Sequence, residues 1–241
     1  MPDLLKGKAC FVKEISVTSS MFDEEKEVLF YDKVRNIFVM NNHRLAFYCW
    51  QKHFNNLKHG KIVIVHIDFH PDACPINKGD MDDFKKHTDL RWLTKKYLLW
   101  DNFISAFALR NNNDVKVISL VQENELGNAF DQEYEKFEVK NFSNEQEESF
   151  FKYLKNENID ILDIDLDYFL DVNLAQNLFT PWSKERINDF FLKLFSVIKS
   201  PKIITIATSP SCTGTIFENN LSIKSSSIYK IVKNNLHKFL V

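Results

Sequence analysis

Short apolar runs rich in β-branched residues alternate along this chain with longer segments that have helical spacing. The runs predict buried strands at residues 37–40, 62–67, 115–121, 159–166 and 203–207. The segments between them predict helices: one over 45–57, one or two within 84–109, and others at 150–154, 187–198 and 225–240. Strands that alternate with helices are typical of a mostly parallel sheet covered by helices on both faces. We therefore expect an α/β fold, a single three-layer domain over residues 1–241.

Composition argues against several classes of protein. The formal net charge is -2, which gives no electrostatic basis for binding nucleic acid or an anionic membrane. No apolar run approaches the roughly 20 residues that a membrane span needs. The first residues lack the apolar centre of a secretory signal, so we expect a cytoplasmic protein. Four scattered cysteines without a CxxC pair predict reduced thiols. Cys74 and Cys212 lie beside candidate site segments, so a role at the site stays open for these two.

The second predicted strand ends in the segment HIDFHPD, which holds four potential metal ligands: His66, Asp68, His70 and Asp72. Residues two apart in a strand point to the same side, so His66, Asp68 and His70 share a face while the strand lasts. Pro71 indicates that the strand has ended before Asp72. Burial of carboxylates is costly unless they are paired or bound to metal. The segment therefore predicts a metal site at the carboxyl end of a buried strand, where ligands of such sheets bind.

The fourth predicted strand ends in DILDIDLDYF, which places Asp163, Asp165 and Asp167 on one face. Three carboxylates on one face repel each other unless cations neutralise them. The alternative is that one or two of them cap helices or pair with lysines. Because both acidic segments end strands of the same predicted sheet, we favour a shared cation site.

A third candidate ligand is His43, which follows the first predicted strand in NNHRLAF and opens a helix. A histidine in that place is by itself more typical of a cap or a core residue, but the two acidic segments make it a candidate ligand. Aspartate oxygens with a minority of imidazoles suit manganese, with iron or zinc as alternatives. About six ligands are too many for one tetrahedral zinc and fit two divalent ions bridged by carboxylates.

These segments resemble the ligand motifs of the arginase, agmatinase and related ureohydrolase family. HIDFHPD resembles the family's DAHxD motif, DIDLDYF its DxDxxDP segment, and NNHRLAF its GGDHS segment. The succession VMNNH, HIDFHPD, NFI, DIDLDYF and TIATSP is more similar still to a divergent branch of the arginase–deacetylase superfamily. That branch includes the peptide arginases, which convert arginine side chains of peptides to ornithine. The resemblance covers residues 35–220, and only its two Asp-rich motifs are specific.

The resemblance implies a manganese-dependent hydrolase that releases urea from an arginine side chain, with a peptide favoured as substrate, through a hydroxide held between two ions. It implies that the ligands of one ion are His43, Asp68, Asp72 and Asp165. It implies that those of the other are Asp68, His70, Asp165 and Asp167, with Asp163 and Asp165 as an alternative to the last pair. Asp72 would also hold the hydroxide and pass a proton to the leaving amine.

The chain departs from the arginase pattern at three places. Residues 41–42 are asparagines where arginases have glycines. Residues 208–209 are Thr-Ser where arginases have the glutamate that receives the guanidinium, so Glu218 becomes the first candidate for that role and Glu123 the second. His87 is the candidate for the proton-shuttle histidine, against the alternative of a surface histidine on a helix.

Three further residues have two interpretations each. His66 either orients a ligand or is a core histidine bonded to backbone. Asn102 and Trp100 are candidates for lining the pocket, although core packing is favoured for Trp100.

Two other functions remain open. One is a metal-dependent amide hydrolase that deacetylates an acylated amine, but relatives of that type use paired histidines and a late tyrosine, and this chain has no His-His pair. The other is a non-catalytic relative that keeps the metal for binding.

Overall fold

The computed structural model describes residues 28–54, 60–111, 114–122, 137–173, 178–210 and 221–239. Within them, the main sheet has seven strands in the order β1-β2-β9-β6-β3-β4-β5. Its strands are β1 (Leu29–Asp32), β2 (Ile37–Met40), β3 (Lys61–Asp68), β4 (Asp114–Val121), β5 (Phe137–Ser143), β6 (Ile161–Asp165) and β9 (Ile203–Ala207). Every neighbouring pair is parallel except β1 with β2. A small antiparallel ribbon joins β7 (Leu170–Asn173) to β8 (Leu178–Pro181).

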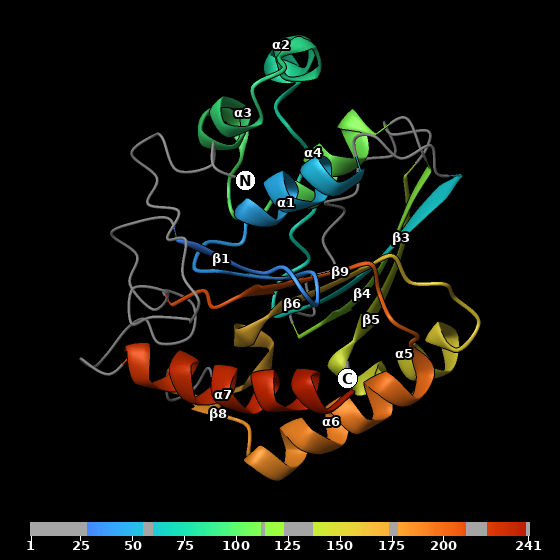
Figure 1. The fold of residues 1–241 in the computed structure, drawn as a ribbon, viewed down its shortest axis with the longest axis vertical. Coiled ribbons are helices and arrows are strands. Elements are labelled where there is room, and N and C mark those ends of the chain that lie inside the picture. The colour runs from blue at the N-terminus through green and yellow to red at the C-terminus, as the bar shows by residue number, and fades with distance from the viewer. Residues whose placement is uncertain are drawn as a thin grey trace.

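Helices cover both faces of the main sheet (Figure 1). One face carries α1 (Leu45–Phe54), α2 (Met81–Lys86), α3 (Leu90–Tyr97) and α4 (Phe103–Arg110). The other carries α5 (Glu147–Leu154), α6 (Lys184–Val197) and α7 (Leu221–Phe239). Alternation along each strand feeds two separate cores: Ile62 and Ile64 pack under α1 and α4, whereas Val63 and Val65 pack under the opposite helices. The predicted α/β fold of three layers is thereby confirmed.

All five predicted strands are present, with small shifts of their ends. The fourth runs from Ile161 to Asp165 and not over 159–166, because the chain turns at once into a short 3-10 helix, Leu166–Phe169. Asp167 therefore lies beyond the strand, which corrects the expectation that three aspartates alternate along it. That all 241 residues form one domain stays a prediction.

Other elements differ from the sequence-based expectation. The segment 84–109, predicted to hold one or two helices, contains part of α2, all of α3 and most of α4. Asp89 starts α3 by accepting the N–H groups of Arg91 and Trp92, which breaks the helical pattern there. Strands β1 and β5 were not predicted. None of the described helices is long and apolar enough to cross a bilayer.

The parallel arrangement decides where polar side chains gather. Strands β2, β9, β6 and β3 are consecutive in the sheet and run in the same direction, so their carboxyl ends lie along one edge. His43 follows β2, Asp68 ends β3 and Asp165 ends β6. These residues are far apart in sequence and meet because the strands are neighbours.

Candidate metal centre

Three carboxylates from two strand ends surround one histidine nitrogen. His43 Nδ1 lies 3.0 Å from Asp68 Oδ2 and 3.1 Å from Asp72 Oδ2. The same nitrogen lies 3.1 Å from Asp165 Oδ2. All four side chains are at most 4% exposed. An imidazole nitrogen and three carboxylate oxygens therefore face each other in a space closed to water.

A second group of potential ligands shares Asp68 with the first. His70 Nδ1 lies 3.7 Å from Asp68 Oδ1 and 3.5 Å from Asp167 Oδ2. One ligand atom from each of these three residues lies within 4.8 Å of the others. The two groups are thus adjacent, and Asp68 stands between them. We call these six side chains the cluster: His43, Asp68, His70, Asp72, Asp165 and Asp167.

Hydrogen bonds to the backbone explain how each acidic segment turns two ligand side chains toward the cluster. Asp68 Oδ1 accepts the N–H of His70 at 2.8 Å, which turns the chain as β3 ends. Asp165 Oδ1 accepts the N–H of Asp167 at 3.1 Å, and it does the same at the end of β6. Aspartates commonly bond to backbone two residues on. Each of these acids therefore uses one oxygen to fold its own loop and turns the other toward His43.

Asp163 is bonded to the rings of His43 and His66 and fixes their orientation. Its Oδ2 lies 2.9 Å from His43 Nε2 and 2.9 Å from His66 Nδ1. Thr205 Oγ1 donates to the other oxygen of Asp163, and Trp50 Nε1 donates to Thr205 Oγ1 at 3.2 Å. The bond to Asp163 fixes the ring of His43 with Nδ1 toward the cluster. Burial opposes a charge on His43, but the surrounding aspartates raise its pKa well above the ordinary value, so a cation at Nδ1 would take the place of a proton.

His66 is held at both ring nitrogens. Besides its bond to Asp163, its Nε2 lies 3.1 Å from the backbone oxygen of His70. Both partners are acceptors, so both ring nitrogens donate and the ring carries a positive charge. Burial opposes that charge, but Asp163 and Asp68 raise the pKa of His66 above its ordinary value. Both interpretations of this residue therefore hold: it is a core histidine bonded to backbone, and it anchors the acid that orients His43.

The residues present fit a bound divalent cation. His43 Nδ1 and Asp68 Oδ2 are buried and have no hydrogen-bond partner, although they lie 3.0 Å apart. Asp72 Oδ1 is also buried without a partner. Buried polar atoms are nearly always satisfied, so unpaired atoms that face one point indicate a place for a cation. Hard carboxylate oxygens with a minority of imidazole suit manganese and similar ions.

The ionisation of the cluster shows the same shortage of positive charge. Burial, together with the charge of Asp68, raises the pKa of Asp72 to about 7. Burial and the charges of Asp165 and Asp68 hold the pKa of Asp167 well above its usual range. Burial opposes the charge on His70, but Asp167 and Asp68 raise its pKa to about 12. Without metal, Asp72 and Asp167 therefore tend to retain protons that a divalent cation would replace, whereas the neighbouring histidines hold the pKa of Asp68 well below its usual range.

Two residues of the site have left-handed backbone, which is unusual outside glycine. Asp72 has a φ of 44° and Ser209 a φ of 34°. Asp72 projects to His43 from the loop after β3, while Ser209, just after β9, donates from Oγ to Asp165 Oδ2. Strained backbone of this kind persists where the surroundings impose it and is concentrated at functional sites.

The structure does not bring every predicted site residue to the cluster. His87 follows α2, its ring stacks on Trp92 with centroids 3.9 Å apart, and its Nδ1 accepts the N–H of Asp89. None of these contacts joins it to a cluster residue in the described part of the chain. Glu218 and Glu123 lie outside the described residues, as do Cys10 and Cys212.

Other predicted residues lie beside the site. Trp100 is 55% exposed, so the expectation of core packing was wrong. Asn102 is buried and bonds to backbone at Leu99 and Tyr97. Thr208 is buried, and its N–H donates to the backbone oxygen of Met40. Burial and the nearby charge of Asp101 raise the pKa of Cys74 to about 11, so it remains a neutral thiol.

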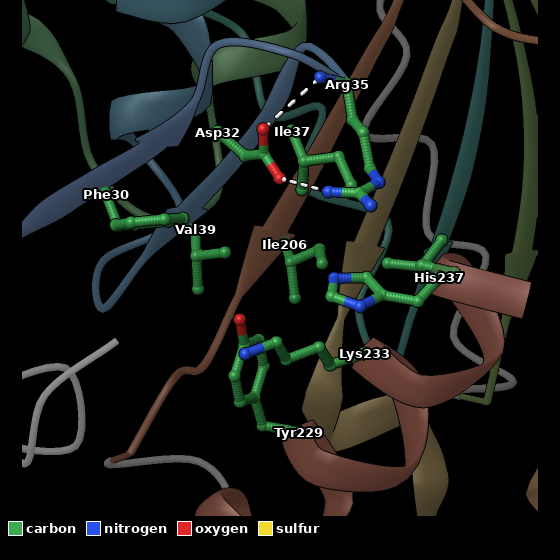
Figure 2. Close-up of a pocket in the computed structure, with 10 residues that line it drawn as sticks. Phe30, Asp32, Arg35, Ile37, Val39, Ile206, Tyr229, Lys233 and His237 are labelled. Carbon is green, nitrogen blue, oxygen red and sulfur yellow. Dashed lines mark hydrogen bonds and ion pairs between the residues drawn. The ribbon is translucent and has the colours of Figure 1, made fainter. Parts of the chain in front are cut away.

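A separate cavity of about 230 Å³ lies on the opposite face of the sheet (Figure 2). Val39 and Ile206 form part of its apolar wall and belong to the core under α5, α6 and α7. Lys233 and His237 reach it from α7 (Figure 2). It contains no residue of the cluster, whose His43 ring packs on Phe103 of α4.

Comparisons with known proteins find arginases as distant structural neighbours. No model of a known protein family and no curated protein matches the chain. Among solved structures, the arginase of Helicobacter pylori is 16% identical, with a TM-score of 0.47 over 90% of this chain and 74% of that one. Arginase from Bacillus caldovelox is 13% identical, with a TM-score of 0.48 over 90% and 71%. Likenesses this distant say nothing about the role of any residue in the site.

Proposed function

We propose that this protein is a manganese-dependent amidinohydrolase that releases urea from the arginine side chain of a peptide and leaves ornithine. The observation that carries the proposal is the meeting of Asp68, Asp72 and Asp165 around the unpartnered Nδ1 of His43. The similarity of the two acidic motifs to ureohydrolase motifs supports the choice of a guanidino substrate. A cytoplasmic location is part of the same proposal.

The proposed ligands form two sets that share two acids. The first set is His43, Asp68, Asp72 and Asp165. The second is Asp68, His70, Asp165 and Asp167, of which Asp68, His70 and Asp167 come within reach of one ion. Two bound divalent ions would supply the acidity that makes water a nucleophile at neutral pH. Asp163 is bonded to two histidine rings, so we assign it to positioning rather than to either set.

Asp72 is the proposed group that holds and moves a proton. Its Oδ2 faces His43, while its Oδ1 is buried without a hydrogen-bond partner. That second oxygen can accept a proton from the attacking water and deliver it to the leaving amine. We propose Asp72 for this role in preference to His87, whose ring is stacked on Trp92. Glu218 and Glu123 remain the proposed partners for the substrate guanidinium.

The proposal is tested on protein purified after growth with manganese. Elemental analysis is expected to find about two manganese ions per chain. An arginine-containing peptide should then yield urea and ornithine, and free arginine and an acetylated lysine peptide should be assayed in parallel. Acetate without urea would establish the amide hydrolase instead, and bound metal without turnover of any of these substrates would establish a binding protein.

Two variants and a control tie activity to the cluster. Asp68→Asn and Asp165→Asn each remove a carboxylate from both proposed sets, so urea release should fall by more than about a hundredfold. Asp189→Asn, an exposed aspartate on α6, should keep full activity and metal content. Urea release by folded Asp68→Asn at the unmodified rate contradicts the proposed mechanism. Circular dichroism checks that each variant is folded.

A further inference from the structure

Exposure differs sharply among the residues of the cluster. The side chains of His43, Asp68, Asp72, Asp165 and Asp167 are at most 4% exposed, whereas that of His70 is 25% exposed. Within the described residues, the cluster therefore reaches solvent at His70. A substrate that approaches through this part of the molecule must pass beside that ring.

Trp100 lies beside His70 at this opening. The centroids of the two rings are 5.4 Å apart, and their planes are inclined by 67°. Trp100 is nevertheless 55% exposed, and its neighbour Leu99 is 58% exposed. A single exposed apolar residue needs no explanation, but a half-exposed indole against a candidate metal ligand is placed where a substrate would cover it.

Hydrogen bonds hold the turn that carries Trp100. The side chain of Asn102 accepts the N–H of Leu99 at 2.9 Å and donates to the backbone oxygen of Tyr97 at 3.2 Å. The N–H of Cys74 donates to the backbone oxygen of Asp101 at 2.7 Å, which ties the turn to the loop that carries Asp72. The exposed ring is therefore presented by a fixed backbone, so a ligand that binds it has little backbone ordering to impose.

We propose that Trp100 is a positioning residue on which the guanidinium of the substrate stacks as it enters past His70. A guanidinium is planar, always charged and weakly hydrated, so it stacks well on aromatic faces. Tryptophan gives the strongest cation–π contact of the aromatic residues. The inference rests on the proposed function and adds a residue that selects a planar cation over a neutral analogue.

The stack should favour the substrate over the transition state. Attack by water makes the central guanidinium carbon tetrahedral, which removes the planarity on which stacking depends. Removing an interaction that exists in the bound substrate but not in the transition state raises KM and kcat together and leaves kcat/KM nearly unchanged. We expect Trp100→Leu, which keeps apolar volume but loses the aromatic face, to raise KM about five- to thirtyfold. The kcat should rise by a similar factor, so that kcat/KM stays within about threefold, and Trp100→Phe should reverse most of the rise in KM.

Steady-state kinetics on the manganese-loaded enzyme form the first arm of the test. Trp100→Leu and Trp100→Phe are compared with Leu192→Ala, which removes an exposed apolar side chain from α6 on the other face of the sheet. The control should leave KM unchanged. If urea is released but KM of Trp100→Leu stays within twofold, the inference about Trp100 is overturned while the proposed function stands.

A binding arm needs no turnover. Methylguanidinium is titrated into the manganese-loaded protein, neutral methylurea is the control, and tryptophan fluorescence is recorded. Methylguanidinium should change the emission of the unmodified protein, methylurea should not, and the response should disappear in Trp100→Leu. An equal response in Trp100→Leu, or none in the unmodified protein, overturns the inference. Because binding alone is measured, this arm tests the role of Trp100 even if no urea is formed.

Discussion

Asp163 is the residue on which the geometry of the site most depends. It is fully buried and bonds to His43, His66 and Thr205. Burial of its charge is unfavourable, yet the neighbouring histidines lower its pKa below the ordinary value. It therefore remains a carboxylate, and its bond to Nε2 of His43 fixes the ring with Nδ1 toward the cluster.

We predict that Asp163→Asn lowers the affinity for manganese about ten- to a hundredfold, because partners that orient a ligand contribute on that scale. An amide has the shape of the carboxylate but lacks the charge that holds His66 and fixes the ring of His43. Competition with a fluorescent chelator measures the affinity, and circular dichroism verifies folding. Unchanged affinity would mean that Asp163 has no part in positioning.

Sequence reasoning reached the cluster residues but not the role of Asp163. Acids at the ends of two parallel strands must lie on the same edge of the sheet, and that follows from the sequence pattern. The bond between His66 and Asp163 depends on β3 and β6 being neighbours with these two residues in register. Strand order is a tertiary property, and no local pattern reports it. The exposure of Trp100 was missed because a tryptophan near apolar segments resembles a core residue.

Among the elements, α6 stabilises the fold on the face of the sheet opposite the proposed metal ligands. It packs Ile187, Phe190 and Phe191 into the core on the face opposite the cluster. Its first turn is capped by Ser183, whose hydroxyl accepts the N–H of Arg186 at 3.2 Å. The helix therefore contributes to folding without touching a proposed ligand.

We predict that Ser183→Ala lowers the free energy of unfolding by about 1 kcal/mol, because an unsatisfied N–H remains at the start of the helix. Ser183→Asp should keep most of that stability, because a carboxylate also caps well. Urea denaturation measures both changes. Manganese content should be the same in all three proteins, and a loss of metal in Ser183→Ala would show that the two faces are coupled.

Some strands and helices could be predicted from the sequence, and others could not. The long strands with continuous apolar runs were predicted correctly because both of their faces are buried. Strand β5 was missed since it lies at an edge, where Glu138 and Lys140 are exposed and interrupt the apolar run. The helices within 84–109 were divided by capping at Asp89 and by the turn before α4, which apolar spacing alone does not mark.

At the scale of the whole molecule, negative charge is concentrated in one buried region, which favours binding of a cation there. The chain carries a formal net charge of only -2, yet five aspartates gather in one buried region: Asp68, Asp72, Asp163, Asp165 and Asp167. Three histidines face them, His43, His66 and His70. Concentrating acids in this way is unfavourable for folding unless positive charge is added. Bound metal would therefore stabilise the fold as well as perform chemistry.

Anomalous scattering from manganese in crystals of the purified protein tests most directly whether the cluster binds metal. We predict two peaks, one between His43 Nδ1 and the carboxylates of Asp68, Asp72 and Asp165, the other beside His70 and Asp167. Manganese peaks only at other places, or no peak after soaking the crystals at a saturating manganese concentration, would contradict the claim that these side chains form one metal centre.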